Sequence, residues 1–289
     1  MQIKKCKRKE ENEMKKVISY ILSFILIILI ILVCLLTIMK STILNEEYVI
    51  SKLEEAKYYD RMNGEIIEQF KNYTIQSGLS DDVLENLFTT EKLKEDIKQV
   101  IDSIYTGKKL TIDTTEIIEN LKNNIVEEVE AAGKTVDFEE EAMEEYLNAI
   151  ANAYESQVSY STNTINSVAD TLAKVLNLFG TVQIAVYVAT AVIAVIIIVV
   201  NIKQIIGLKY LTIALMGTGI FMLAAKIMLQ QSIDFNNIML MNQAVSQVIQ
   251  LVINDILTNI TIVGIVLLVI GVIGNFVYNL LYNKYLAEE

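Results

Sequence analysis

Four long apolar runs constrain the fold of this 289-residue chain more than any other feature. An α-helix rises about 1.5 Å per residue, so about twenty apolar residues can cross a hydrocarbon core roughly 30 Å thick. The first run reads VISYILSFILIILIILVCLLTIM and contains no charged residue. We therefore expect an all-α membrane protein with four transmembrane helices. The expected spans are 17–40, 181–203, 208–229 and 256–282.

Lysine and arginine residues near the ends of the runs predict the orientation of the chain. Seven of them lie in the tail at 1–16, two more (Lys203 and Lys209) lie between the second and third runs, and Lys284 follows the fourth. With four crossings these segments fall on one side of the membrane. We expect them in the cytoplasm of a plasma membrane, together with the tail at 283–289. The segments expected outside are 41–180 and 230–255.

Tyrosines support this orientation. Amphipathic rings are favoured at the boundary between lipid and water. Four tyrosines lie near the expected cytoplasmic boundary: Tyr20, Tyr210, Tyr278 and Tyr282.

A cleaved signal peptide is the alternative interpretation of the first run, because a basic segment precedes it. Its apolar core is too long for that role, and no small-x-small cleavage site follows it. Lipid modification of Cys34 would need a small residue before it, but the preceding residue is Val33, so we do not expect this modification. We expect an uncleaved anchor.

Since Cys6 and Cys34 both precede the segment 41–180, that segment has no cysteine with which to form a disulfide.

The segment 41–180 is strongly acidic. It contains 28 Asp and Glu against 12 Lys and Arg, whereas the rest of the chain contains 7 against 12. Such a field repels phosphate backbones, so we expect no nucleic-acid partner. Basic peptides and metal ions remain open as partners. A simpler interpretation is that the charge keeps the segment soluble and away from an anionic membrane surface.

Helix-capping residues recur along the acidic segment, and the chain contains no proline. Ser, Asn and Asp side chains begin helices, and glycine ends them. We therefore expect helices throughout, with 108–112 as a link that is open to a short strand. The expected helices are Asn45 to Tyr59, Gly64 to Gln76 before Gly78, a short helix after Ser80, Thr90 to Tyr105 before Gly107, Asp113 to Ala132 before Gly133, and one opened by the capping box of Asp137 and Glu140.

This last helical pattern continues through Gly180 towards the second span, which predicts a helical stalk that leaves the membrane. Apolar residues alternate at three- and four-residue steps, a spacing typical of left-handed helix packing. We expect the stalk to pack against the outer segment 230–255, forming a bundle that begins in lipid and continues in water. A helix lying flat on the membrane is the alternative, although such helices usually carry Lys or Arg on their polar face. The two seams are Ile165, Val168, Leu172, Val175 and Phe179, and Ile238, Met241, Val245, Val248 and Val252.

The first half of the chain resembles an uncharacterised group of membrane proteins from clostridia-like Gram-positive bacteria. The resemblance implies an N-terminal anchor, an extracytoplasmic helical domain facing the cell wall and C-terminal membrane helices. It implies no activity. The residues that carry it are Tyr58-Tyr59, Gly78-Leu79, Ile101-Asp102, Ile104-Tyr105, Gly107-Lys108 and Asp113-Thr114.

No residue stands out as catalytic, cofactor-binding or metal-binding. The chain contains no histidine, and the acidic segment contains no cysteine, which removes the usual general bases, nucleophile pairs and zinc ligands. Hard cations need six or more oxygens in a preformed cage. We therefore interpret two acidic clusters as solvated helix faces, and we expect neither an enzyme nor a cofactor. The clusters are Glu139, Glu140, Glu141, Glu144 and Glu145, and Asp81, Asp82 and Glu85.

The function predicted from these features is a contact role in the bacterial cell envelope, as an adaptor, assembly factor or sensor. The expected partners are the lipid bilayer and a protein of the membrane or envelope, and self-association into a homo-oligomer is compatible with the sequence. A subunit of an oligomeric channel or transporter is the alternative. The residues relevant to that alternative are the charged Lys40, Lys226 and Asp255 and the asparagines Asn259, Asn275 and Asn279.

The small residues of the third and fourth spans are expected to allow close packing of the helices. They are Ala214, Gly217, Thr218, Gly264 and Gly271.

Overall fold

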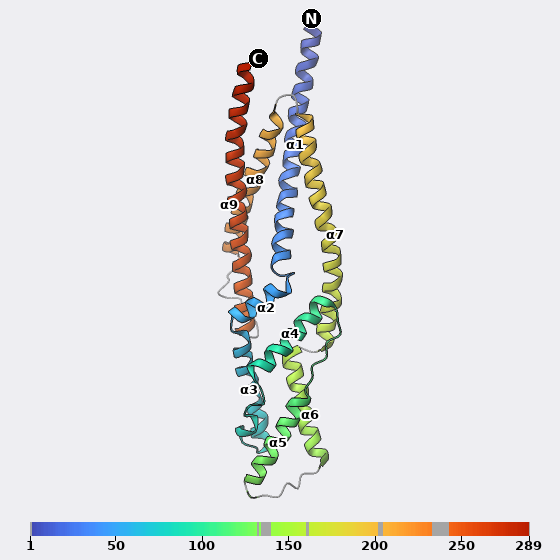
Figure 1. Ribbon diagram of the computed structural model, residues 1–289, viewed down its shortest axis with the longest axis vertical. Helices are drawn as coiled ribbons and strands as arrows, with labels where there is room; N and C mark the ends of the chain where they lie inside the picture. Colours follow the sequence, from blue (N-terminus) through green and yellow to red (C-terminus); the bar gives the residue numbers. More distant parts are fainter. Residues whose placement is uncertain are drawn as a thin grey trace. The chain divides into compact units, whose positions relative to one another are not determined.

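The computed structural model describes residues 2–131, 133, 140–159, 162–201, 205–232 and 243–288. Regular structure within these ranges is helical, without a strand, which confirms the predicted all-α class (Figure 1). The chain divides into two compact units. We call the first, Met1–Leu44, Leu178–Ile238 and Gln250–Glu289, the membrane unit, and the second, Asn45–Asn177 and Met239–Ile249, the helical domain.

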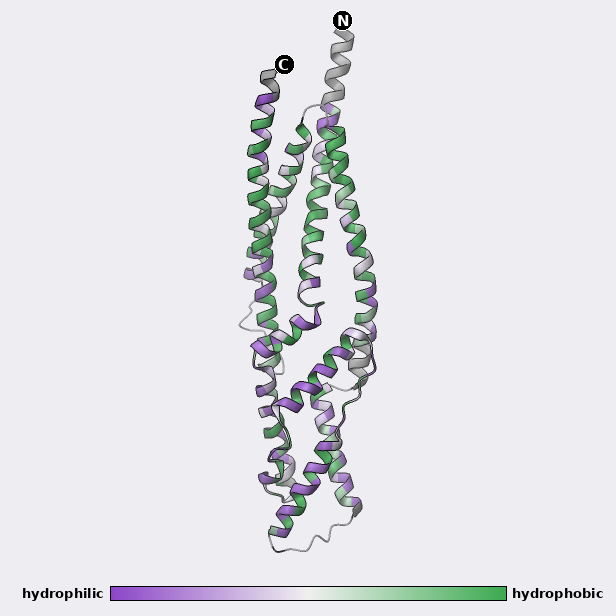
Figure 2. Cartoon of the chain, in the orientation of Figure 1, coloured by the Kyte–Doolittle hydropathy of each residue, from purple (hydrophilic) through white to green (hydrophobic). Residues whose placement is uncertain are grey.

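Four helices are long and apolar enough to cross a membrane, as the sequence predicts. Their apolar stretches appear as mostly green in Figure 2. Side chains on their outer faces, such as Phe24, Ile184 and Phe276, are each more than 60% exposed, which is where lipid tails would take the place of water. The helices are α1 (Gln2–Ser41), α7 (Thr162–Val200), α8 (Ile206–Ser232) and α9 (Gln243–Glu288).

Within the membrane unit, the start of α1, the end of α7, the start of α8 and the end of α9 lie at the same end (Figure 1). Asn201 Nδ2, just after α7, donates to Ser19 Oγ of α1 over 2.8 Å. Ser23 Oγ of α1 donates to the carbonyl oxygen of Tyr210 in α8 over 2.9 Å. Of the basic residues near these segments, Lys15, Lys16, Lys209 and Lys284 lie in the described helices and therefore belong to this end.

Two of the membrane helices extend beyond the predicted spans. Helix α7 begins at Thr162 and passes through Gly180 without a break, so the predicted continuation of the second span is confirmed. Helix α9 begins at Gln243, so residues 243–255 of the helical segment expected at 230–255 belong to the same helix as the fourth span. Neither proline nor glycine occurs between 243 and 263 to end the helix.

The structure describes only some of the apolar residues in the two predicted seams. The side chains of Ile165 and Val168, and residues Ile238 and Met241, lie outside the described part of the structure. On α7, Val175 is 44% exposed. On α9, Val245 and Val248 pack against the core of the helical domain.

The helical domain consists of short helices with local caps. Asn45 Oδ1 accepts from the Tyr48 amide over 3.2 Å, and Thr89 Oγ1 accepts from the Lys92 amide over 3.2 Å. Gly78 and Gly107 end their helices at φ +71°, where a side chain would be strained. The helices are α2 (Glu46–Glu55), α3 (Tyr58–Ser77), the 3-10 helix η1 (Asp81–Leu84), α4 (Thr90–Thr106), α5 (Thr115–Ala131) and α6 (Glu140–Ser159).

The boundary between the first two helices of the domain differs from the prediction. The break between α2 and α3 falls at Lys57, which has a left-handed φ of +51°, and Gly64 lies inside α3. This earlier start of α3 places Tyr58, Tyr59 and Met62 in the core. The link at 108–112 is not a strand, although its Leu110 and Ile112 are buried in the same core. The predicted capping residue Asp137 lies outside the described residues.

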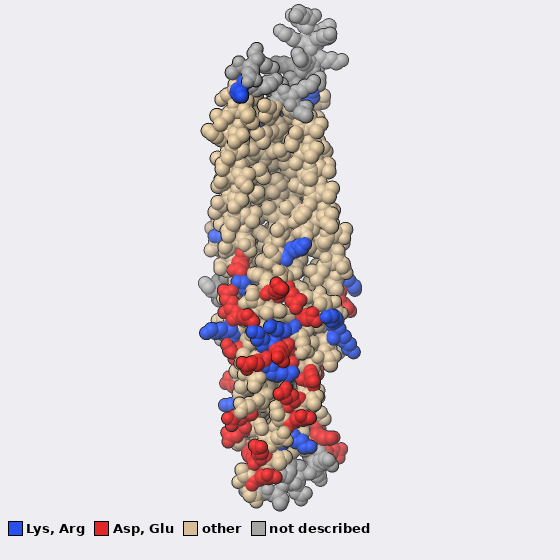
Figure 3. Space-filling view, viewed as in Figure 1, with Lys and Arg blue, Asp and Glu red and all other residues tan. Residues whose placement is uncertain are grey.

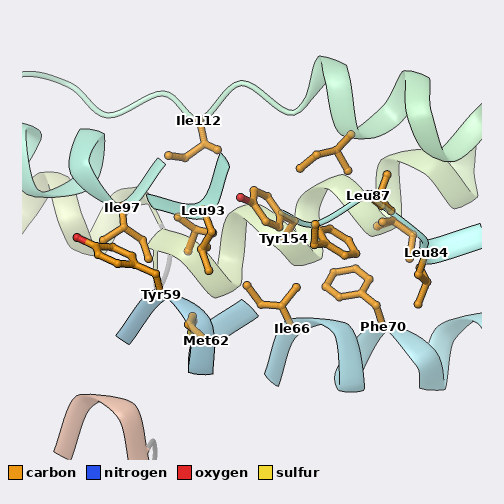
Figure 4. Close-up of a cluster of buried hydrophobic side chains, with 14 of the residues drawn as sticks. Tyr59, Met62, Ile66, Phe70, Leu84, Leu87, Leu93, Ile97, Ile112 and Tyr154 are labelled. Atoms are coloured by element: carbon orange, nitrogen blue, oxygen red, sulfur yellow. The ribbon is translucent and has the colours of Figure 1, made fainter. Parts of the chain in front are cut away.

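A single apolar core unites these helices (Figure 4). Phe70, Leu121 and Ile150 are fully buried, and Tyr154 is 1% exposed. Phe88 is tilted by 40° against Phe70 and stacked on Tyr154, with ring centroids 4.7 and 5.6 Å away. Ala244, at the start of α9, is also fully buried in this cluster. The domain therefore uses its own apolar side chains to hold itself together, in keeping with a segment that contains no cysteine.

Candidate functional site

Carboxylates are spread over the face of the helical domain that Figure 3 shows, with lysines between them. Glu141, Glu144 and Glu145 are all exposed along α6, as expected of a solvated helix face. The side chains of Glu139 and Glu140 lie outside the described residues. The remaining predicted cluster, around η1, lies at a hollow and is the better candidate for a site.

This hollow, which we call the acidic hollow, lies between α3, η1 and the turn that follows η1 and has a volume of about 380 Å³. Leu84 and Phe88, 5% and 6% exposed, supply apolar walls. Asp81 accepts from Thr74 Oγ1 over 3.1 Å and pairs with Lys71 over 3.6 Å. The lining residues are Ile67, Lys71, Asp81, Asp82, Leu84, Glu85, Asn86, Phe88 and Thr89.

The turn after η1 is held from α5. Asn124 Nδ2 donates to the carbonyl oxygens of Val83 and Glu85 over 2.9 and 3.2 Å. Asn86, in the same turn, has a left-handed φ of +58°, which asparagine tolerates better than most residues. The sequence singles out the acids of this region, but it gives no signal that Asn124, about forty residues further on, fixes their backbone.

A buried polar pair lies inside the domain, away from its surface. Asp96 on α4 is fully buried. Its Oδ2 accepts from the Tyr154 hydroxyl over 2.7 Å, and its Oδ1 accepts from Lys92 Nζ over 3.0 Å. Burial, and then the bond to Asp96, raise the pKa of Tyr154 well above its usual value. Because both partners are satisfied and shielded from solvent, this pair orients α6 on α4 and is no open reaction centre.

Replacing Tyr154 with phenylalanine tests that role. The variant keeps the ring but leaves Asp96 Oδ2 without its donor, so we expect the domain to lose about 1.5–3 kcal/mol of unfolding free energy. Tyr73→Phe removes a hydroxyl from a side chain that is 37% exposed and should change the free energy by less than about 0.5 kcal/mol. Urea unfolding of both variants is the measurement, and equal effects would contradict the assigned role.

Tyr59 has a buried hydroxyl with no hydrogen-bond partner among the described residues. Burial, and then the charge of Glu54, raise the pKa of Tyr59 to about 12. A tyrosine whose pKa is raised in the folded state contributes to stability at every pH below about 10, the ordinary tyrosine pKa. This contribution is lost as the pH rises from about 10 to about 12.

The Tyr59→Phe variant should therefore lose less stability than the parent chain in alkaline solution. Near neutral pH it should be at least as stable, because no hydrogen bond is removed. The measurement is the urea midpoint of both proteins near pH 8 and near pH 11, at about the middle of the titration window. An identical fall in the two midpoints would contradict the raised pKa.

The membrane unit carries polar side chains at two levels. At one level are the side chains of Ser19, Ser23 and Asn201, with the bonds described above from Asn201 to Ser19 and from Ser23 to the carbonyl oxygen of Tyr210. At the other, Gln183 Nε2 donates to the Tyr187 hydroxyl over 2.9 Å, and that hydroxyl lies 2.8 Å from Thr37 Oγ1. Between Ser23 and Thr37, α1 runs about 20 Å and contributes Leu26 and Cys34 to apolar clusters. The two polar levels are therefore separated by packed apolar side chains.

The tyrosines near the predicted cytoplasmic boundary divide into two groups. Tyr20 is 53% exposed, as the boundary interpretation expects. Tyr210 and Tyr278 are only 3% and 7% exposed, so these two rings pack inside the membrane unit and do not face lipid. Tyr20 contacts Tyr210 edge to face, with centroids 5.0 Å apart. A hydropathy pattern could not show which tyrosines point inward.

The small residues of the third and fourth spans are packing positions, as predicted. Ala214 and Thr218 are fully buried. A Cβ added to Gly271 would lie 2.5 Å from Met216 Cγ, and one added to Gly219, which the sequence reasoning missed, would lie 2.7 Å from the carbonyl oxygen of Gly264. Helices α8 and α9 are therefore in close backbone contact at these glycines.

The polar residues considered for transport lie at intermediate or exposed positions. Lys40 and Asn279 are exposed, and four others are partly buried: Lys226, Asp255, Asn259 and Asn275. None of these six residues is fully buried. The three ionisable ones, Lys40, Lys226 and Asp255, therefore avoid the fully buried positions at which a charge would be most costly.

These features define an all-helical chain of the membrane-protein class, with four helices able to cross a bilayer and one folded helical domain. Comparisons with protein-family models, with curated proteins and with solved structures give no match to the chain.

Proposed function

We propose that this chain is a multi-pass protein of a bacterial plasma membrane whose helical domain lies outside the cytoplasm and binds another protein of the membrane or envelope. In this role it serves as an adaptor, an assembly factor or a sensor, not as a catalyst. The observation that carries the proposal is the surface of the domain, where exposed carboxylates cover helices whose apolar side chains are already packed inside.

The orientation rests on the basic residues of the membrane unit. Lys15, Lys16, Lys209 and Lys284 belong to segments that lie at one end of it. A positive end is retained in the cytoplasm during insertion, so both termini are cytoplasmic and the acidic segment is exported. We further propose, from the resemblance described above, a Gram-positive envelope in which the domain faces the wall.

A contact role fits the carboxylates better than chemistry does. A pair of catalytic carboxylates needs two different environments that hold their pKa values apart. Glu141, Glu144 and Glu145 share one solvated face, and Asp96 is enclosed by its partners. These groups can attract a cationic partner, but they present no acid and base to one substrate.

The alternative role, as a subunit of a channel or transporter, would require a path that one copy does not supply. Apolar clusters containing Leu26 and Cys34 separate the two polar levels along α1. A polar path would then have to form between copies in an oligomer, lined from α9 by Asn275 and Asn279.

Photocrosslinking in living cells tests the proposal. A photoreactive amino acid is placed in the full chain at Glu141 or Glu145 on α6, and at Ile184 and Phe276 on lipid-facing positions. The contact role predicts a discrete crosslinked protein from α6 and none of comparable yield from the lipid-facing positions. Crosslinks between copies from α9 alone, with none from the domain, would favour the channel subunit and contradict the contact role.

A further inference from the structure

Lysines lie next to tyrosines at the end of the membrane unit where α1 begins. In three pairs, one on each of three helices, the lysine is nearer that end and the tyrosine follows within one helical turn, about 6 Å along the axis. Tyrosine rings are favoured where hydrocarbon meets the lipid headgroups. The lysines therefore belong to the headgroup layer. The pairs are Lys16 and Tyr20 on α1, Lys209 and Tyr210 on α8, and Lys284 and Tyr282 on α9.

On α1 the pair is part of a longer column of exposed side chains. Lys16, Tyr20 and Phe24 recur at every fourth residue, so they lie on one face of the helix. Each of the three side chains is more than half exposed. Over about 12 Å the column changes from a cation to an amphipathic ring and then to an apolar ring. This is the order of chemistry along a phospholipid, from its phosphate through its ester groups to its acyl chains.

Helix α8 brings a second lysine to the same level. The ring of Tyr20 contacts that of Tyr210 edge to face, with centroids 5.0 Å apart. The bond from Ser23 Oγ to the Tyr210 carbonyl oxygen holds the start of α8 against α1. Lys209, the residue before Tyr210, therefore lies at the seam between α1 and α8, near the level of Lys16. Cations on two neighbouring helices are suited to hold one anionic headgroup.

The charge at this end favours an anion. Glu13 pairs with Lys16 over 2.9 Å, but both side chains are more than half exposed, and such a pair contributes little free energy. A phosphate that approaches Lys16 can therefore compete with Glu13. Residues 1–16 contain seven Lys and Arg against three Glu, so the start of α1 keeps an excess of positive charge. This excess attracts an anionic lipid more strongly than a zwitterionic one.

We propose that the seam between α1 and α8 at this end binds an anionic phospholipid. The headgroup phosphate contacts Lys16 and Lys209, the Tyr20 ring lies beside the ester groups, and an acyl chain lies along Phe24. The inference requires that the helices cross a bilayer. It depends neither on the direction of insertion nor on the contact role of the helical domain, so its failure would leave both of those proposals standing.

Native mass spectrometry of the full chain in a neutral detergent tests the site. Phosphatidylglycerol and phosphatidylcholine with the same acyl chains are added in equal amounts, and the ratio of the two lipids on the protein is measured. We expect a preference for phosphatidylglycerol. The variant Lys16→Gln, Lys209→Gln should lower this preference about five- to twentyfold. Lys16→Arg, Lys209→Arg keeps both charges and should retain the preference within about twofold, which separates a loss of charge from a loss of structure.

The matched control removes two lysines from the same helices. Lys40 on α1 and Lys226 on α8 have no tyrosine within four residues, and Lys40→Gln, Lys226→Gln should change the preference by less than about twofold. No preference in the parent chain, or equal losses in the two glutamine variants, would overturn the site, because binding would then follow net charge at most. Displacement of the bound lipid by glycerol phosphate at the same concentration would also overturn it, since a free phosphate would then bind as well without an acyl chain.

Discussion

Replacing Phe70 with alanine should destabilise the helical domain by about 3–5 kcal/mol, the usual cost of removing a buried aromatic ring. Phe70 is fully buried on α3 and contacts Phe88, which in turn stacks on Tyr154 of α6. The cavity would therefore open between α3, the turn after η1 and α6. Because small domains have only about 5–15 kcal/mol of stability in total, a measurable fraction of the variant should be unfolded at 37 °C.

Pulse proteolysis of the full chain in micelles, over a series of urea concentrations, measures this loss. The control is Ile75→Ala on the same helix, where the side chain is 68% exposed and the expected change is below about 0.5 kcal/mol. A loss of less than about 1 kcal/mol for Phe70→Ala would show that this ring is not a core residue.

Replacing Gly219 with alanine should destabilise the membrane unit by about 1–3 kcal/mol, the cost of overpacking a tight contact. Its new Cβ would lie 2.7 Å from the carbonyl oxygen of Gly264 and 2.8 Å from the amide nitrogen of Leu268. Both are backbone atoms, so no side chain can rotate away. Helices α8 and α9 would have to move apart and lose the contacts around the glycines.

The control is Gly180→Ala on α7, where the added Cβ meets nothing within 4 Å. This substitution should be neutral or stabilise by up to about 1 kcal/mol, because alanine is the better helix former. The measurement is the temperature at which each purified variant loses its monodisperse peak after heating in detergent. A Gly219→Ala variant that survives to the same temperature as Gly180→Ala would contradict the close packing of α8 on α9.

The features predicted correctly from the sequence depend on neighbouring residues. The four spans follow from length and apolar content, and caps such as Asn45 and Gly107 follow from residue type next to a helical pattern. The break at Lys57 was not predicted, because a left-handed lysine leaves no local signal. Gly64, which the sequence marked as a helix start, is exposed within α3 and shows that glycine alone does not fix a boundary.

Features that need distant partners could not be read from the sequence. Lys92 and Asp96 look like an ordinary pair on a helix surface, and only Tyr154, 58 residues after Asp96, shows that the acid is buried. The acidic hollow depends in the same way on Asn124, and the inward orientation of Tyr210 depends on contacts with α1. In each case the sequence provides the residue type, and the fold determines its surroundings.

The central claim, that the acidic helical domain is exported while both termini stay inside, is tested most directly by cysteine labelling in wall-stripped intact cells. Cys6 and Cys34 are replaced with serine, and single cysteines are introduced at Glu141 on α6 and at Lys284 near the end of α9, both of which are exposed. A membrane-impermeant maleimide should label the cysteine at 141 in intact cells and the cysteine at 284 only after lysis. Labelling of 284 in intact cells, with 141 protected until lysis, would show that the chain is inserted in the opposite orientation.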